Sequence, residues 1–177
     1  MSLGFVLTLH SHLPWVLHHG RWPHGSDWLC EAALDTYLPL VGALRRLEAT
    51  GTAAPITLGV TPILAAQLAH PSFREELEAY FTHRLQTLHE APASLRETGD
   101  QALLPVVPWW QQHIQELKRI WQAIDGDLIA EFRRHAQAGR LELISSAATH
   151  GFLPLLARDE SIRLQLLVGR AEHLRHF

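Results

Sequence analysis

Histidines at two places in the sequence could together bind a ligand. His10 and His12 follow an apolar, β-prone run, and their spacing points both side chains to the same side of an extended chain. His150 follows another β-prone run much later in the sequence. Ligand groups in parallel α/β folds collect at the carboxyl ends of strands, so these imidazoles could line one pocket. The alternative is that one or more of them are hydrogen-bonded structural histidines.

Two kinds of ligand suit such a set of side chains. Imidazole is a good zinc ligand, and a His-x-His pair after a first strand is a common arrangement in barrel hydrolases, although no well-placed aspartate accompanies it here. A sugar is the other candidate, because aromatic rings stack on its apolar faces while imidazoles bond its hydroxyl groups. Trp15, Trp22 and Trp28 lie in the same histidine-rich stretch. Their crowding favours the sugar.

Composition narrows the class of protein. The 177 residues are 47% hydrophobic and 19% charged, which fits one domain, or a piece of a larger one, with a sizeable core and argues against disorder or a coiled coil. The net charge is −3 and the basic residues are scattered, so nucleic acid is not an expected partner. No apolar run is long enough to cross a membrane. The single cysteine, Cys30, and the lack of a secretory signal favour the cytoplasm.

Alternating strand and helix patterns must position these residues. The predicted strands are residues 5–9, 56–60 and 141–145. The predicted helices are residues 31–49, 72–89, 108–138 and 160–177, with a short helix after Thr61. This order predicts an α/β fold with a parallel sheet. Residues 13–28 and 90–107 are expected to be loops, and the first of these is of the long, irregular kind that is usually functional.

Several residues mark expected helix boundaries and packing. Pro39 predicts a kink or a helix start, and Asp125–Asp127 a break in the long helix. Thr61, Ser72 and Asp159 are expected to cap helices through their side chains. The remaining tryptophans, which are expected to pack in the core or against helices, are Trp109, Trp110 and Trp121.

Four stretches taken together resemble glycoside hydrolase family 57, and in particular its 1,4-α-glucan branching enzymes. They are residues 9–15, 31–40, 56–62 and 148–156, so the resemblance spans nearly the whole chain. The resemblance implies a seven-stranded, incomplete β/α barrel of parallel strands alternating with helices. Residues 1–177 would be the N-terminal portion of that catalytic domain, with only its first few strands.

The resemblance also implies roles for particular residues. His10, His12 and His150 would hold the sugar unit that is cleaved, and Trp22 matches an aromatic position in the loop on the substrate side. No metal is required in the family, which weakens the zinc interpretation, and no other cofactor is expected. The substrate would be an α-1,4-glucan such as amylose or a glycogen-like polymer, and the enzyme would serve glycogen biosynthesis as a glycosyltransferase.

The catalytic carboxylates of the family are not expected within this sequence. The nucleophilic Glu and the general-acid Asp would both fall beyond Phe177, and a retaining glycosidase needs both. We therefore expect the chain alone to be inactive and to act together with a C-terminal part of the enzyme. An α-amylase or 4-α-glucanotransferase of the same family, and a non-catalytic carbohydrate-binding protein, are the alternatives.

Overall fold

A three-stranded parallel sheet forms the centre of the computed structural model, which describes residues 4–52 and 55–177. The strands lie in sequence order and are β1 (Thr8–Ser11), β2 (Ile56–Val60) and β3 (Leu141–Ile144). The predicted α/β class with parallel strands is confirmed. The first strand begins at Thr8 rather than Phe5, because Thr8–Ser11 is the stretch that pairs with Thr57–Val60 of β2.

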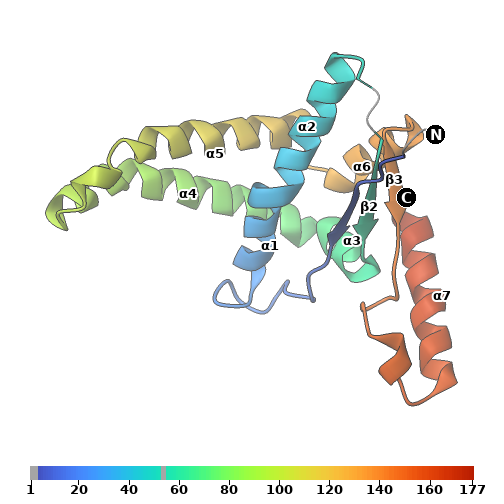
Figure 1. Ribbon diagram of the computed structural model, residues 1–177. Helices are drawn as coiled ribbons and strands as arrows, with labels where there is room; N and C mark the ends of the chain where they lie inside the picture. Colours follow the sequence, from blue (N-terminus) through green and yellow to red (C-terminus); the bar gives the residue numbers. More distant parts are fainter. Residues whose placement is uncertain (1–3, 53–54) are drawn as a thin grey trace.

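The helices surround the sheet and extend well beyond it (Figure 1). They are α1 (Ser26–Ala32), α2 (Leu38–Ala49), α3 (Pro62–Leu68), α4 (Pro71–Glu97), α5 (Val106–Ala123), α6 (Leu128–Gln137) and α7 (Asp159–His176), with short 3₁₀ turns at Gln101–Leu103 and Leu153–Leu155. Helices α4 and α5 pack side by side as an arm that projects away from the sheet, while α7 packs against α3 on the opposite side.

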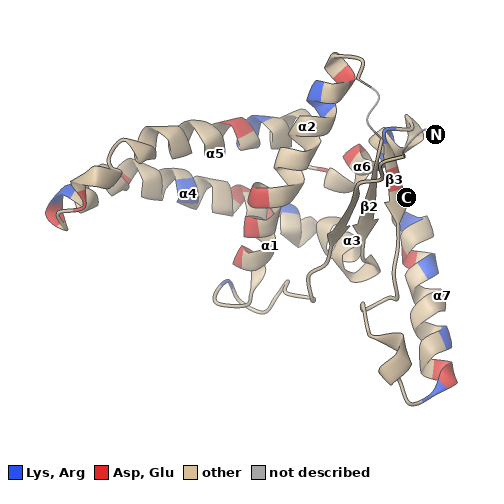
Figure 2. Ribbon diagram, in the orientation of Figure 1, with Lys and Arg blue, Asp and Glu red and all other residues tan. Residues whose placement is uncertain are grey.

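One continuous apolar core joins the sheet to the helices. Its largest fully buried side chains are Trp121, Phe73, Phe81 and Phe132, from α5, α4 and α6. Charged residues are spread over several helices, and Lys and Arg do not gather on one face (Figure 2). None of the helices within residues 4–52 and 55–177 is both long and apolar enough to cross a bilayer.

Two prolines, Pro39 and Pro92, affect the helices in different ways. Pro39 lies in the first turn of α2, as the predicted helix start requires, and residues Ala33–Tyr37 before it form a π-helical segment that joins α1 to α2. Pro92 lies inside α4 and cannot donate to the carbonyl oxygen of Leu88, one turn earlier. The side-chain amide of Gln111 on α5 donates to that oxygen instead, at 3.0 Å. The expected loop from residue 90 is therefore helical as far as Glu97.

The expected side-chain caps are mostly absent. Thr61 and Asp159 begin helices without a capping bond from their side chains, and α4 is capped by the imidazole of His70, which accepts from the backbone N–H of Ser72 at 3.2 Å. The break at Asp125–Asp127 is confirmed, and Asp127 caps α6 by accepting from the N–H of Ala130.

Candidate functional site

Three imidazole rings meet at the carboxyl end of the sheet. The ring of His12 stacks on that of His150, with centroids 4.3 Å apart and 22° between the planes. The ring of His10 lies 4.9 Å from that of His150, tilted by 31°. His10 and His150 are exposed and His12 is half-buried. The predicted gathering of His10, His12 and His150 is therefore observed, and the rings open to solvent. We call these three residues the histidine cluster.

The pairing of β1 with β2 places the first two histidines. His10 lies opposite Gly59, and a Cβ at Gly59 would come 3.1 Å from Nδ1 of His10. The lack of a side chain on Gly59 thus leaves room for the His10 ring. The Nδ1 atom of His12 lies 3.2 Å from the hydroxyl oxygen of Thr61, within hydrogen-bonding distance. This contact explains why the Thr61 side chain does not cap α3.

The third histidine is placed by the turn after β3 and by α7. His150 has a positive φ of 58°, a left-handed conformation that few non-glycine residues adopt. The side chain of Gln165 on α7 accepts hydrogen bonds from the backbone N–H of Thr149 at 3.0 Å and from its hydroxyl group at 3.2 Å. Gly169 lets α7 approach closely, because a Cβ there would lie 2.6 Å from the carbonyl oxygen of Ser146. The backbone before His150 is therefore held against α7.

The surroundings of His12 favour the neutral form of its ring. Burial lowers the pKa of His12, and the neighbouring imidazoles of His150 and His10 lower it further because like charges would repel. A neutral imidazole has one donor and one acceptor nitrogen, and therefore suits a hydroxyl group, which also donates and accepts. The His12 ring can therefore bind a polar, uncharged group near neutral pH.

An open hollow adjoins the cluster on the side of β3. Its volume is about 530 Å³, and its lining comes from Ser146, Ala147 and the segment from His150 to Pro154. Phe152, one of the lining residues, is 68% exposed. An apolar surface with an exposed ring beside imidazoles is the combination that a sugar requires.

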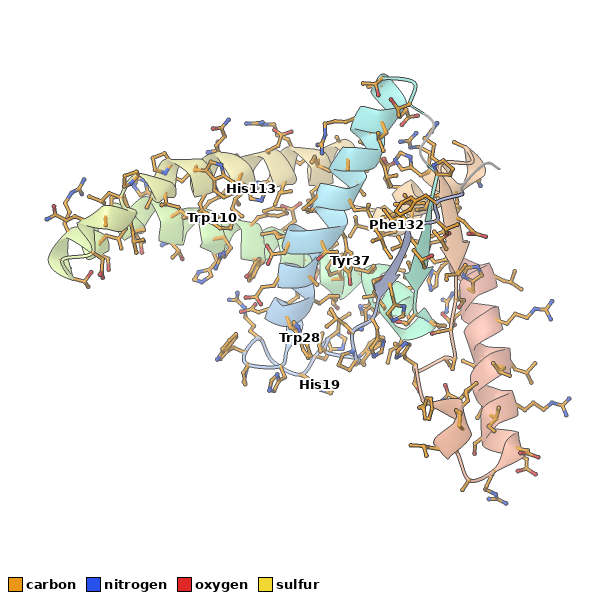
Figure 3. The ribbon with its side chains drawn as sticks, viewed as in Figure 1. His19, Trp28, Tyr37, Trp110, His113 and Phe132 are labelled. Carbon is orange, nitrogen blue, oxygen red and sulfur yellow. The ribbon has the colours of Figure 1, made fainter. Side chains whose placement is uncertain are left out.

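The tryptophans near the N-terminus do not close over the cluster. Trp22 is 76% exposed in the loop before α1, and no ring contact joins it to the three histidines. Trp15 instead packs against the His70 ring, edge to face, and Trp28, on α1, lies near His24 of the preceding loop. Figure 3 shows Trp28 at the start of α1, next to the loop that carries His19. These indoles thus contact other histidines or solvent, and not the rings of His10, His12 and His150.

The remaining tryptophans divide between the core and the arm. Trp121 is fully buried, as expected of a core residue. Trp109 and Trp110 are 57% and 37% exposed, so they are not core residues. They lie on α5 with His113, whose ring stacks on Trp109. Figure 3 labels Trp110 and His113 well out along the arm, away from the sheet.

Neither a metal site nor a reactive thiol emerges from the described part of the chain. Within residues 4–52 and 55–177, no three His, Cys, Asp or Glu side chains are arranged to coordinate an ion. The rings of the cluster meet through their faces, whereas ligand rings converge on an ion through their nitrogen atoms. Cys30 is buried, and the pKa of its thiol is raised to about 12. Burial is the main cause, and the negative charges of Asp27 and Glu76 add to it.

Sequence reasoning missed the residues that support the histidines. Gln67, Gln165 and the hydroxyl group of Thr61 contact the segments that carry the cluster, yet each stands in an ordinary helical or capping pattern. Phe152 was identified only as part of a longer stretch. A single sequence contains no signal for such long-range contacts.

Comparison with known proteins identifies the family. The model for glycosyl hydrolase family 57 matches residues 6–177. A 1,4-alpha-glucan branching enzyme of Thermococcus kodakarensis is 38% identical over 97% of this chain, which spans 25% of that relative. A probable 1,4-alpha-glucan branching enzyme of Mycobacterium tuberculosis is 34% identical over 86% of this chain, which spans 31% of it. The chain thus spans about a quarter to a third of the length of these relatives.

Solved structures agree in fold. A branching enzyme of Pyrococcus horikoshii superposes with a TM-score of 0.89 at 36% identity, covering 97% of this chain and 32% of its own. An alpha-amylase of Thermotoga maritima gives a TM-score of 0.81 at 25% identity with the same coverage of both chains. Both neighbours have a barrel fold, to which the three-stranded sheet corresponds. The chain belongs to glycosyl hydrolase family 57.

Proposed function

We propose that this chain supplies part of the sugar-binding surface of an enzyme that acts on α-1,4-glucans. The main support for this proposal is that His10, His12 and His150, from the ends of two non-adjacent strands, form one solvent-accessible cluster. Sugar hydroxyl groups would bond the imidazoles, and the apolar face of a glucose unit would lie in the hollow beside Phe152. The substrate would be amylose or a glycogen-like polymer.

The specific activity that we propose is 1,4-α-glucan branching. In that reaction an α-1,4 bond is cut, the glycosyl unit is held on a glutamate, and a sugar 6-hydroxyl group receives it. Relatives named as branching enzymes, at 34–38% identity, support this choice. The enzyme would then be a cytoplasmic glycosyltransferase of glycogen biosynthesis.

Within such an enzyme, residues 1–177 would be the N-terminal portion of the barrel domain. The nucleophilic Glu and the general-acid Asp would then lie beyond Phe177, as the resemblance to the family implies. The histidine cluster would therefore orient the sugar, while a C-terminal part of the enzyme would cleave the bond. Trp22 would contact glucan units outside the cluster, because its indole is exposed in the neighbouring loop.

A second candidate is hydrolysis rather than branching. The alpha-amylase of Thermotoga maritima also matches over 97% of the chain, which keeps amylase activity open, and with it 4-α-glucan transfer, which differs only in the acceptor. A third is carbohydrate binding without catalysis. All three share the sugar-binding cluster and differ in the residues that would follow it.

Calorimetry with maltohexaose tests the binding role. We expect the purified protein to bind maltohexaose more tightly than cellohexaose, and His12→Ala and His150→Ala each to lower the affinity about tenfold or more, which corresponds to roughly 1.4 kcal/mol. His89→Ala, on the exposed surface of α4, is the matched control and should bind as the wild type does. Unchanged affinity in both cluster variants would contradict the proposal.

An activity assay tests whether this chain alone can catalyse the reaction. The 177-residue chain should neither branch nor hydrolyse amylose, measured by the iodine complex and by reducing ends. Branching or hydrolysis by this chain alone would show that the reacting carboxylates lie within it.

A further inference from the structure

We infer that Gln67 and Gln165 are positioning residues for the histidine cluster. Each glutamine uses its side-chain amide to fix the backbone beside one of the two histidine-bearing segments. That the two glutamines place the rings is inferred from the hydrogen bonds alone. That they also affect sugar affinity rests on the proposed sugar-binding function of the cluster.

Gln67 holds the segment that follows His12. It lies on α3 and is fully buried. Its Oε1 atom accepts from the backbone N–H of Val16 at 2.7 Å, and its Nε2 atom donates to the carbonyl oxygen of Pro14 at 2.9 Å. The two bonds fix the backbone on both sides of Trp15. Because Thr61 at the start of α3 also contacts His12, this one short helix restrains both the His12 ring and the backbone that follows it.

Gln165 holds the segment that precedes His150. Its Oε1 atom accepts from the N–H and the hydroxyl group of Thr149, and the backbone carbonyl oxygen of Gln165 accepts from the N–H of Ala148 at 3.0 Å. These contacts tie two consecutive residues to α7 immediately before the left-handed His150. The side-chain bonds of Gln165 add to two backbone bonds of the turn, in which the N–H of Ala148 donates to Gln165 and the N–H of His150 donates to Ala147. Together these bonds would hold the conformation that brings the His150 ring onto His12.

The positioning role can be separated from ordinary stabilisation. Gln111 also donates its side-chain amide to a backbone carbonyl oxygen, that of Leu88, but on the arm formed by α4 and α5. It therefore matches the donation of Gln67 to Pro14, and, like Gln165, it ties a helix to a distant backbone segment, while lying on elements that do not carry the cluster. Loss of the Gln111 bond should affect unfolding and leave the three rings in place.

The test compares four variants of the purified protein. Gln165→Met removes the side-chain amide, whereas Gln165→Glu keeps an oxygen that accepts from the N–H of Thr149. Gln67→Met removes both bonds to the loop, and Gln111→Met is the control. Three quantities are measured for each: the affinity for maltohexaose, the nuclear Overhauser contact between the His12 and His150 rings, and the melting temperature.

Positioning predicts a definite pattern. Gln165→Met should lose the ring contact and bind maltohexaose about tenfold more weakly, whereas Gln165→Glu should keep the contact and bind within about threefold of wild type. Gln111→Met should lower the melting temperature without changing either of the other two quantities. Gln67→Met should resemble Gln165→Met; if it does not fold, the two Gln165 variants decide the matter.

Three outcomes would overturn the inference. The first is a Gln165→Met protein that retains the ring contact and wild-type affinity. The second is equal loss in Gln165→Met and Gln165→Glu, because the oxygen that accepts from the N–H of Thr149 would then not be sufficient to position His150, contrary to the inferred contact. The third is the same loss of affinity in Gln111→Met. If the wild type binds no maltohexaose, the proposed function fails, and the ring contact still decides whether the glutamines position the histidines.

Discussion

The Nδ1 atom of His12 lies 3.2 Å from the hydroxyl oxygen of Thr61, so the residue that starts α3 is also a partner of the histidine cluster. A hydroxyl group in an N-terminal position of this kind usually bonds the helix backbone. Here it restrains an imidazole that a second imidazole stacks against. The restraint limits the ring to few orientations and leaves its other nitrogen for a ligand.

We predict that His12 makes the stability of the protein depend on pH. Its pKa is lowered by burial and then by His150 and His10, so the unfolded chain takes up a proton at a higher pH than the folded chain does. The free energy of unfolding should therefore fall as the pH drops below about 6.5, and should be unaffected by this group at higher pH. Melting temperatures between pH 5 and pH 8 measure the effect.

The variant His12→Asn isolates this contribution. His135 and His173 also have lowered pKa values, mainly through burial, but they are present in both proteins and cancel in the difference. The wild type should lose more melting temperature than the variant below pH 6.5. Parallel curves for the two proteins would show that His12 does not carry the effect.

We predict that Gly59→Ala weakens sugar binding without unfolding the protein. The added Cβ would lie 3.1 Å from Nδ1 of His10 and at an ordinary 3.6 Å from Ile144. The His10 ring should move away from His150, and affinity for maltohexaose should fall about threefold to tenfold. Gly4→Ala, where a Cβ would meet no atom within 4 Å, is the control. An unchanged His10 imidazole spectrum in Gly59→Ala would contradict the prediction.

We predict that Trp22→Ala affects long glucans more than short ones. The indole is 76% exposed, so its removal should change the free energy of unfolding by no more than about 0.5 kcal/mol. Since Trp22 lies outside the cluster, affinity for maltose should stay constant while that for maltoheptaose falls. Isothermal titration of both sugars measures the two affinities. Equal loss for both would instead place Trp22 at the histidines.

We predict that Glu131→Gln destabilises the fold at neutral pH. Glu131 is only 5% exposed and bonds Arg45 at 2.7 Å and Arg134 at 3.0 Å. Breaking a fully buried ion pair costs about 3–5 kcal/mol, and we expect about 2 kcal/mol here because both guanidinium groups reach solvent. Urea unfolding at pH 7 measures the loss. Glu116→Gln, which breaks an exposed pair with Arg119, should cost less than about 0.5 kcal/mol.

The effect of Glu131 should disappear in acid. Burial alone would raise the pKa of this carboxyl group, but hydrogen bonds from Arg134 and Arg45 outweigh it and lower the pKa to about 2. A carboxyl group with a lowered pKa stabilises the fold above its unfolded value of 4.5, and this contribution is lost as the pH falls towards 2. The wild type and Glu131→Gln should therefore converge in stability between pH 4.5 and pH 2. A constant difference over that range would contradict this origin.

The sequence predicted the parts of the structure that depend on local patterns. Three apolar runs predicted three parallel strands, and the positions of His10, His12 and His150 at strand ends predicted that their rings would meet. Register, however, depends on pairing partners, which is why β1 begins at Thr8 and not Phe5. The strand-end rule succeeded because it concerns topology rather than exact boundaries.

The wrong predictions concern places where contacts with residues distant in sequence override the local pattern. Pro92 should end a helix, yet the amide of Gln111 bonds the carbonyl oxygen that the proline leaves without a donor. Ser72 resembled a helix cap, but His70 caps α4, and the Ser72 hydroxyl lies 3.0 Å from Nε2 of His18. Trp109 and Trp110 were expected to pack in the core or against helices, and they lie partly exposed on the arm.

His150 has a left-handed backbone, with a φ of 58°, which costs stability, whereas its imidazole would serve ligand recognition. Glycine would relieve strain of about 1 kcal/mol at this position, although its greater freedom in the unfolded chain offsets part of that gain. His150→Gly should therefore melt at the same temperature as the parent or higher, while lacking the third imidazole. A library selected for heat resistance alone would be expected to discard this histidine, and one selected for glucan capture to retain it.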